Sequence, residues 1–379
     1  MAQVSKTPVS DFDAAVRLLS GGTNVALYND LGLPGIYVIK PKGNLSDVIT
    51  TESMGVHPAF RVDGHEIDAF YMGKYLAAVY MGRALSLPLQ DPSAYQVDAS
   101  DKGDAPNTNV NFDNAKLWCE ANGPGFHLPT IAEYAWIALL ARKNETMPHG
   151  NTNYGASSDA AFEKGIGSTY GSDGRVNRTL TGSGPVSWND NGKPDGISDI
   201  CGNVWEWQGG YRIVEGELQF FADNDAAMQW QQNAESSLWK AMLPDGTLVA
   251  PGTAGTLKWD YTADPGTESA AKAFRLNTTI QFKQTVEAPY GGQTMQTLTA
   301  APGVNIPERL IALGIMPESG KTNYGGDWAY MRNMGERLGI RGGHWHRGAH
   351  AGVFGLDGSN PRSSVSTSVG FRPAFIPTP

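Results

Sequence analysis

The chain has 379 residues, a length that fits one large domain or two to three small ones. Hydrophobic residues make up 40% and charged residues 18%, and 46 glycines with 23 prolines favour a loop-rich fold with a packed core. The net charge of −9, with no basic run, excludes a nucleic-acid binder, and no run of 18 apolar residues could cross a membrane as a helix.

The N-terminal region predicts a small β element. Its first 22 residues are interrupted by charged side chains, namely Asp11, Asp13 and Arg17. We therefore expect no signal peptide and a cytoplasmic or virion-associated protein. Residues 25–28 and 35–39 are strand-like and flank a turn. We expect residues 1–50 to form a separate N-terminal β element and residues 51–379 to form the main domain.

Two to three helices are expected in the first half of the main domain. Apolar side chains in Glu66–Ala84 and in Phe112–Asn122 are spaced to give each stretch one buried face. The third helix has the clearest start, because Thr130 and Glu133 have the spacing of a capping box. We expect this helix to end near Arg142.

The second half of the chain is dominated by loops and strands. Residues 144–196 are rich in Gly, Ser, Asn and Asp and predict a long loop. Residues 208–330 are expected to be an insertion, with a short helix at 305–314 between Pro307 and a terminal glycine. Strand-like sequence returns at residues 337–375.

Four motifs occur in a characteristic order along the main domain. They are Leu128-Pro129-Thr130-x-x-Glu133-Tyr134, Gly202-Asn203-Val204-Trp205-Glu206-Trp207, Arg341-Gly342-Gly343-x-Trp345 and Val369-Gly370-Phe371-Arg372. Together they resemble the formylglycine-generating sulfatase-modifying factor superfamily, a branch of the C-type lectin fold. The resemblance implies an α+β, loop-rich C-type lectin fold with short antiparallel strands.

Several residues in these motifs are expected to be structural. Alternation within the second motif places its two indoles on one face of a strand, and large aromatic side chains are usually buried. The expected scaffold residues are Trp205, Trp207, Trp345, Phe354 and Phe371. We also expect Arg341 and Arg372 to pair with carboxylates and to hold the strands together.

The superfamily's enzymes use a pair of cysteines in the closing segment, whereas residues 341–375 contain none. The chain has only Cys119 and Cys201, which we expect to be unpaired core thiols. Serine cannot replace a thiolate nucleophile without a partnered base. We therefore expect no catalytic residue, and an enzyme of this superfamily is kept as the alternative.

Residues 341–375 resemble more closely the variable region of proteins diversified by diversity-generating retroelements. In that family, Asn-type codons on a fixed lectin scaffold are rewritten at their adenines, which can never yield Lys, Glu, Gln or Met. None of these four residue types occurs in residues 341–375. The resemblance assigns ligand binding to the variable positions His344, His346, Arg347, His350, Asp357, Gly358, Ser359, Ser364, Val365, Ser366 and Ser368.

The resemblance implies a binding protein whose partner is a protein or a carbohydrate, for example a cell-surface receptor recognised by a phage. A non-diversified structural virion protein is a further alternative. We expect no cofactor and no metal. The competing interpretations are zinc at His344, His346 and His350, and calcium at Asp195 and Asp199. We expect the polar variable positions to be exposed on one surface, above buried Trp345, Val353, Phe354, Leu356 and Phe371.

Overall fold

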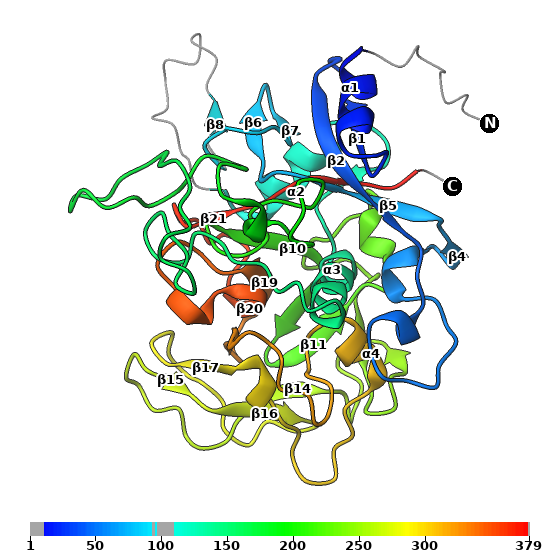
Figure 1. Cartoon of the computed structure of the whole chain (residues 1–379). Helices are drawn as coiled ribbons and strands as arrows, with labels where there is room; N and C mark the ends of the chain where they lie inside the picture. Colours follow the sequence, from blue (N-terminus) through cyan, green and yellow to red (C-terminus); the bar gives the residue numbers. More distant parts are fainter. Residues whose placement is uncertain (1–10, 93–94, 97–109, 378–379) are drawn as a thin grey trace.

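The computed structural model describes residues 11–92, 95–96 and 110–377. They form an α+β fold of short strands, mostly antiparallel, joined by long loops (Figure 1), which confirms the predicted fold class. The helices of the described residues are α1 (Asp11–Leu19), α2 (Phe112–Glu120), α3 (Ile131–Lys143) and α4 (Glu308–Ala312). The predictions for α2, α3 and α4 are confirmed, although α4 is shorter than expected.

A five-stranded antiparallel sheet joins the two ends of the chain (Figure 1). In spatial order its strands are β1 (Asn24–Tyr28), β2 (Pro34–Pro41), β5 (Ala69–Gly73), β22 (Ala374–Phe375) and β9 (Phe126–His127). The β1–β2 hairpin predicted from the sequence is confirmed, but the prediction of a separate element over residues 1–50 is wrong. Residues 37–41 of β2 pair with the whole of β5, and Lys40 forms a buried ion pair with Asp190, so the hairpin belongs to the main domain.

The expected helix over Glu66–Ala84 is wrong, because these residues form strands. They contribute part of β4 (His65–Glu66), all of β5 and β6 (Ala78–Tyr80), and the start of β7 (Arg83–Leu85). Met81 and Gly82 both have positive φ, the backbone of a tight two-residue hairpin turn that a helix cannot contain. The remaining small pairings join β4 to β3 (Arg61–Val62), and β6 to β7 and β8 (Tyr95–Gln96).

The larger sheet is built around β10 (Trp205–Val214), which follows directly from the most specific motif. β10 pairs with β11 on one side and β19 on the other, and its first residues also pair with β21. The remaining strands of this sheet are β11 (Glu217–Phe220), β12 (Lys240–Met242), β13 (Leu248–Val249), β14 (Lys258–Tyr261), β15 (Ala271–Lys272), β16 (Phe274–Asn277), β17 (Tyr290–Thr294), β18 (Trp328–Met331), β19 (Glu336–Gly342), β20 (Gly352–Asn360) and β21 (Val369–Gly370).

Residues 208–330, which were expected to be an insertion, form strands of this sheet. They supply strands β11 to β17, and β18 begins within them. β18 lies parallel to β20, which is part of the segment 341–375, so the late part of the insertion flanks the predicted binding segment.

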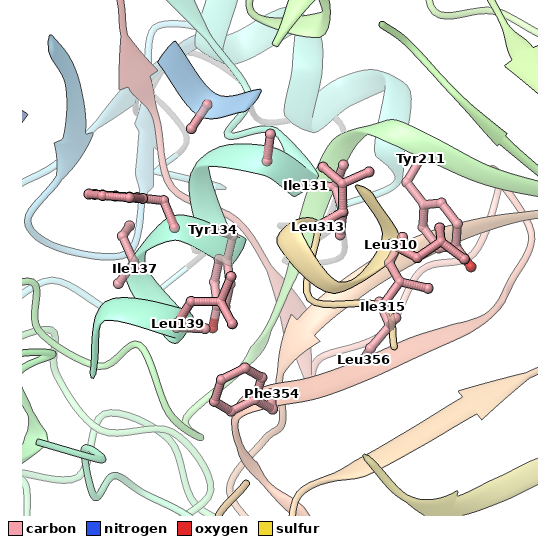
Figure 2. Packing of buried hydrophobic residues seen from close by; sticks show 14 of the residues in the cluster. Ile131, Tyr134, Ile137, Leu139, Tyr211, Leu310, Leu313, Ile315, Phe354 and Leu356 are labelled. Atoms are coloured by element: carbon pink, nitrogen blue, oxygen red, sulfur yellow. The ribbon is translucent and has the colours of Figure 1, made fainter. Parts of the chain in front are cut away.

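The main core lies between α3, α4 and the large sheet. Figure 2 shows side chains of α3, such as Tyr134 and Leu139, gathered with Leu310 of α4 and with Phe354 of β20. α3 begins at the predicted capping box: Thr130 Oγ1 accepts a bond from Glu133 N at 3.1 Å, and Thr130 N donates to Glu133 Oε2 at 3.1 Å. Because α3 is buried around nearly its whole circumference, it forms the centre of the domain.

Residues 144–196 form a loop without named strands, as predicted. Short 3-10 turns occur in the described residues at η1 (Leu45–Asp47), η2 (Pro58–Phe60), η3 (Val186–Trp188), η4 (Asp225–Ala227), η5 (Met295–Thr297) and η6 (Gly348–His350). Cys119 and Cys201 are both buried and unpaired, as expected. Within the described part of the chain, no helix is long and apolar enough to cross a membrane.

Candidate ligand-binding surface

The start of β10 anchors the end of the predicted binding segment. Trp205 N donates to Ser368 O at 2.8 Å, and Glu206 forms a fully buried bidentate ion pair with Arg372, at 2.5 and 2.8 Å. The Arg372 guanidinium also donates to backbone carbonyls, including those of Gly73 and Ser198. The expectation that Arg372 pairs with a carboxylate is confirmed, and this pair ties both sheets to the closing strand.

Arg341 departs from that expectation. Its fully buried guanidinium donates through Nη2 to the carbonyls of Leu313 and Gly314, at 2.9 and 3.0 Å. No carboxylate of the described residues forms an ion pair with it, and its Nε and Nη1 have no partner. Burial lowers its pKa to about 10. The carbonyls at the C-terminal end of α4 take the place of the expected carboxylate.

The expected scaffold side chains are buried. Trp205 and Trp207 lie in the core beside Phe371, and Trp345 packs against Leu76 and Val204. Val353, Phe354 and Leu356 are also buried, with at most 3% of their surface exposed.

The predicted variable residues divide into two groups. His346 and Val365 are exposed, and the half-buried members are Arg347, His350, Ser364, Ser366 and Ser368. The expectation of exposure is wrong for His344, Asp357 and Ser359, which are buried, and the variable position Gly358 is buried as well.

Each of the four buried positions has a local reason. His344 is 4% exposed because the ring of His346 lies against it, with the ring centroids 4.1 Å apart. Asp357, Gly358 and Ser359 belong to β20, which lies between β18 and β19 in the middle of the sheet. A Cβ on Gly358 would lie 2.7 Å from Cδ1 of buried Ile213, so this position faces the core.

The accessible residues of the turn at 344–350 rest on aromatic side chains from elsewhere in the chain. His346 stacks on Tyr154 with centroids 5.8 Å apart and planes 15° apart. His350 stacks on Trp328 at 4.0 Å and 21°. The guanidinium of Arg347 lies 5.2 Å from the ring centroid of Tyr330.

We define this set, His346, Arg347 and His350 with Tyr154, Trp328 and Tyr330, as the aromatic-backed turn. Burial first, and then the positive charge of Arg347, lower the pKa values of His346 and His350. Their imidazoles are therefore uncharged at neutral pH, so Arg347 carries the positive charge of the turn.

Sequence reasoning missed the three aromatic residues that back the turn. Trp328 and Tyr330 alternate with Ala329, which is the pattern of one strand face and was available as a signal. What the sequence did not contain was the long-range pairing of β18 with β20, which brings that face beside residues 344–350. Tyr154 lies in the glycine-rich loop and carried no such signal.

The glycine-rich loop connects the two accessible parts of the segment. The guanidinium of Arg175 lies 3.6 Å from the ring centroid of Tyr154, the ring on which His346 stacks. Three residues later, Arg178 donates to Thr367 O at 3.0 Å, among the half-buried serines. This loop therefore runs from the aromatic-backed turn to residues 364–368.

The residues considered for metal binding do not converge on one point. His344 and His346 contact each other, whereas His350 faces Trp328. Asp195 accepts bonds from Thr23 and Asn191, while Asp199 accepts from Gly182 N at 2.7 Å. Among the described residues, no group of three His, Cys, Asp or Glu side chains is placed to hold a metal ion.

Comparison with known proteins bears on the fold. Residues 59–231 match the family described as the sulfatase-modifying factor enzyme 1-like domain, which confirms the superfamily resemblance over that range. The first two motifs lie within the matched residues, and the two closing motifs lie outside them. No curated protein matches the chain.

Among solved structures, the chain is similar to the Major Tropism Determinant P3c variant, with 12% identity and a TM-score of 0.31, over 93% of this chain and 72% of that chain. It is also similar to Treponema denticola variable protein 1, with 14% identity and a TM-score of 0.31, over 93% of this chain and 99% of that chain.

Proposed function

We propose that this chain, whose residues 59–231 match the sulfatase-modifying factor enzyme 1-like domain, is a binding protein that presents a diversified segment, residues 341–375, on a fixed scaffold. The observation that carries the proposal is the division of the turn at 344–350. Trp345 is buried, whereas His346, Arg347 and His350 reach solvent. Side chains that face solvent can be exchanged at little cost to folding, which a diversified binding segment requires.

The proposed contact residues are the accessible members of the predicted set. They are His346, Arg347, His350, Ser364, Val365, Ser366 and Ser368. Histidine, arginine and serine offer adaptable hydrogen bonds, and the aromatic rings beneath the turn hold them in place, as rigid anchors do in antibody paratopes. The ligand is a protein or a carbohydrate. The role that fits best is recognition of a receptor on the surface of a phage's host cell.

The state of the thiols supports binding over catalysis. Burial raises the pKa values of Cys119 and Cys201 well above the usual range, so both remain protonated at neutral pH. Cysteine chemistry requires the thiolate, and a reactive cysteine lies in an accessible, electropositive environment. Neither cysteine meets that requirement.

Two display libraries test the proposal. The first randomises His346, Arg347 and His350 with adenine-mutagenised codons, and the second randomises His344, Asp357 and Ser359 in the same way. We expect most members of the first library to fold and most members of the second to be lost, measured as protease-resistant display. Burying an arbitrary polar side chain without a partner costs several kcal/mol, which explains the difference. Equal tolerance in both libraries would contradict the proposed presentation of this segment.

The diversification itself is tested in the neighbouring DNA. We expect a reverse transcriptase gene and a near-copy of the codons for residues 341–375, with differences confined to adenines of the template. If the neighbouring DNA holds neither feature, diversification is contradicted, and the chain would be a binding or structural protein whose sequence does not vary.

A further inference from the structure

Arg347 is a cation without an acceptor. Its side chain forms no ion pair and no hydrogen bond with any described residue, and its Nε is inaccessible to solvent and unpaired. The arginines that follow it in the same segment behave differently, because Arg362 pairs with Glu336 and Arg372 pairs with Glu206. A buried donor without a partner costs free energy, so an unpaired one in a folded protein calls for an explanation such as a missing ion or ligand.

Two further polar atoms close to Arg347 also lack partners. The hydroxyl of Tyr330, whose ring lies beneath the guanidinium, is buried and unpaired. Nδ1 of His344 is buried and unpaired as well. Burial lowers the pKa of His344 to about 2, with additional effects from His346 and Arg347, so this ring is neutral. A tyrosine hydroxyl and a guanidinium can both donate, and neither the Tyr330 hydroxyl nor the Arg347 Nε has an acceptor among the described residues.

Two stacks of aromatic rings involve the histidines that flank Arg347 in the turn. His350 with Trp328 forms one stack and His346 with Tyr154 forms the other. The aromatic residues lie outside the segment 341–375, so they remain when the segment changes. Flat rings beside a charged donor suit a small ring-shaped ligand that carries an anion.

We propose that Arg347 binds the carboxylate of an acidic sugar, with the His350–Trp328 and His346–Tyr154 stacks as walls of the site. This inference rests on the proposed function, because it assumes that the ligand contacts the accessible residues of 341–375. A guanidinium matches a carboxylate through two parallel hydrogen bonds. The aromatic walls favour a sugar over an acidic peptide, because the apolar face of a pyranose ring can pack against them.

The charge of the whole protein makes this recognition short-ranged. The chain carries a net charge of −9, so a negatively charged ligand gains nothing from long-range attraction. Binding must come from the contacts with Arg347 and the walls. We therefore expect modest affinity for a single sugar and a clear dependence on this one arginine.

The probes are glucuronic acid, galacturonic acid and N-acetylneuraminic acid, with glucose as the neutral comparison and an oligo-aspartate peptide as the acidic comparison. Binding to the full chain is measured by saturation-transfer NMR and by tryptophan fluorescence. We expect at least one acidic sugar to bind and glucose to bind much more weakly. Loss of a charged hydrogen-bonding pair in R347A should weaken binding about 10- to 100-fold.

Two further variants complete the design. R347K keeps the charge but not the paired donors, and we expect it to recover only part of the binding. R309A removes an arginine that pairs with Asp223, and it serves as the matched control that leaves binding unchanged. W328A should weaken binding of acidic sugars while thermal melting shows a folded protein.

The outcomes separate this inference from the proposed function. If glucose binds as well as the acidic sugars, if the peptide binds instead of them, or if none of the three acidic sugars binds at millimolar concentration, the inference is overturned. The two display libraries decide the proposed function independently, because they measure folding rather than affinity for any sugar. A tolerant first library together with no binding of acidic sugars would leave the proposed function intact and remove only the carboxylate site.

Discussion

At the scale of single residues, buried histidines couple folding to pH. His57 is fully buried; its Nδ1 accepts from Ala59 N and its Nε2 lies 2.9 Å from Ala312 O. Desolvation lowers the pKa of His57 from 6.5 to about 4. His344 is shifted in the same direction. Because both rings stay neutral in the folded chain, protonation favours the unfolded state.

We predict that the contribution of His57 to stability falls as the pH drops from 7 toward 4. The folded pKa of His57 lies below the unfolded value of about 6.5, so the unfolded chain binds the proton first in that window. Between pH 7 and pH 5, His57 should cost about 2 kcal/mol of unfolding free energy. Urea denaturation of the parent protein and of H57N at both pH values measures this, and the difference in unfolding free energy between the two proteins should shrink by about this amount from pH 7 to pH 5. The control H65N changes an exposed histidine and should keep the slope of the parent protein.

A second prediction concerns the motif at the start of β10. Trp205 is 2% exposed and lies between Tyr330 and His344, with centroids 6.3 and 6.4 Å away. Replacing it by alanine removes a large core side chain and should cost about 3–5 kcal/mol. The midpoint of chemical denaturation is the measurement. An unchanged midpoint in soluble, cooperatively folding W205A would show that this indole is not part of the core.

At the scale of elements, the segment 341–375 combines a turn that should tolerate substitutions with a strand that should not. The turn between β19 and β20 faces solvent, whereas β20 has neighbours on both sides. The variable positions predicted from the sequence therefore lie in two different environments, a solvent-facing turn and a strand in the middle of the sheet. A diversified segment that crosses a central strand must restrict change there, because every side chain on such a strand contacts the core or a neighbouring strand.

This contrast predicts different costs for substitutions only a few residues apart. The triple variant H346A, R347A, H350A should melt within a few degrees of the parent protein, because exposed substitutions shift stability by about half a kcal/mol each. G358S places a Cβ 2.7 Å from Ile213 Cδ1 and should cost about 1–3 kcal/mol through overpacking. Differential scanning calorimetry compares the two. A larger loss in the triple variant than in G358S would mean that the turn, and not the strand, supports the fold.

At the scale of the whole molecule, the chain ends meet in one sheet. β22, the last strand of the described residues, pairs with β5 and β9. β5 in turn pairs with β2 of the N-terminal hairpin. The hairpin and the closing strand thus cover both edges of β5. These pairings join described residues of the N-terminal hairpin to residues near position 375 in one sheet.

We predict that a chain beginning at residue 51 does not fold cooperatively. Its β5 would expose an unpaired edge, and the buried carboxylate of Asp190 would lose Lys40, its ion-pair partner. Removing one partner of a buried pair costs about 3–5 kcal/mol by itself, which is a large part of a typical stability. Circular dichroism melting of the truncated chain tests this, and adding residues 1–50 as a separate peptide should restore the transition. A sharp melt of the truncated chain alone would support an independent N-terminal element instead.

The sequence by itself determined the local features of this protein. The capping box at Thr130 and Glu133 specified where α3 begins, since both of its hydrogen bonds join residues three positions apart. The motif at Trp205 predicted a buried structural strand, and the composition of residues 144–196 predicted a loop. Each of these conclusions depends on interactions within a few residues of the chain.

The tertiary structure alone decided which residues share an environment. The spacing of apolar residues over Glu66–Ala84 fitted a helix, but pairing with β2 and β22 made strands of them. The sequence marked His344 and His346 alike, and only packing buried one and exposed the other. Trp328 became part of the candidate site because β18 pairs with β20. The physical reason is that strand pairing and burial depend on residues far apart in the chain, whose contacts no local pattern specifies.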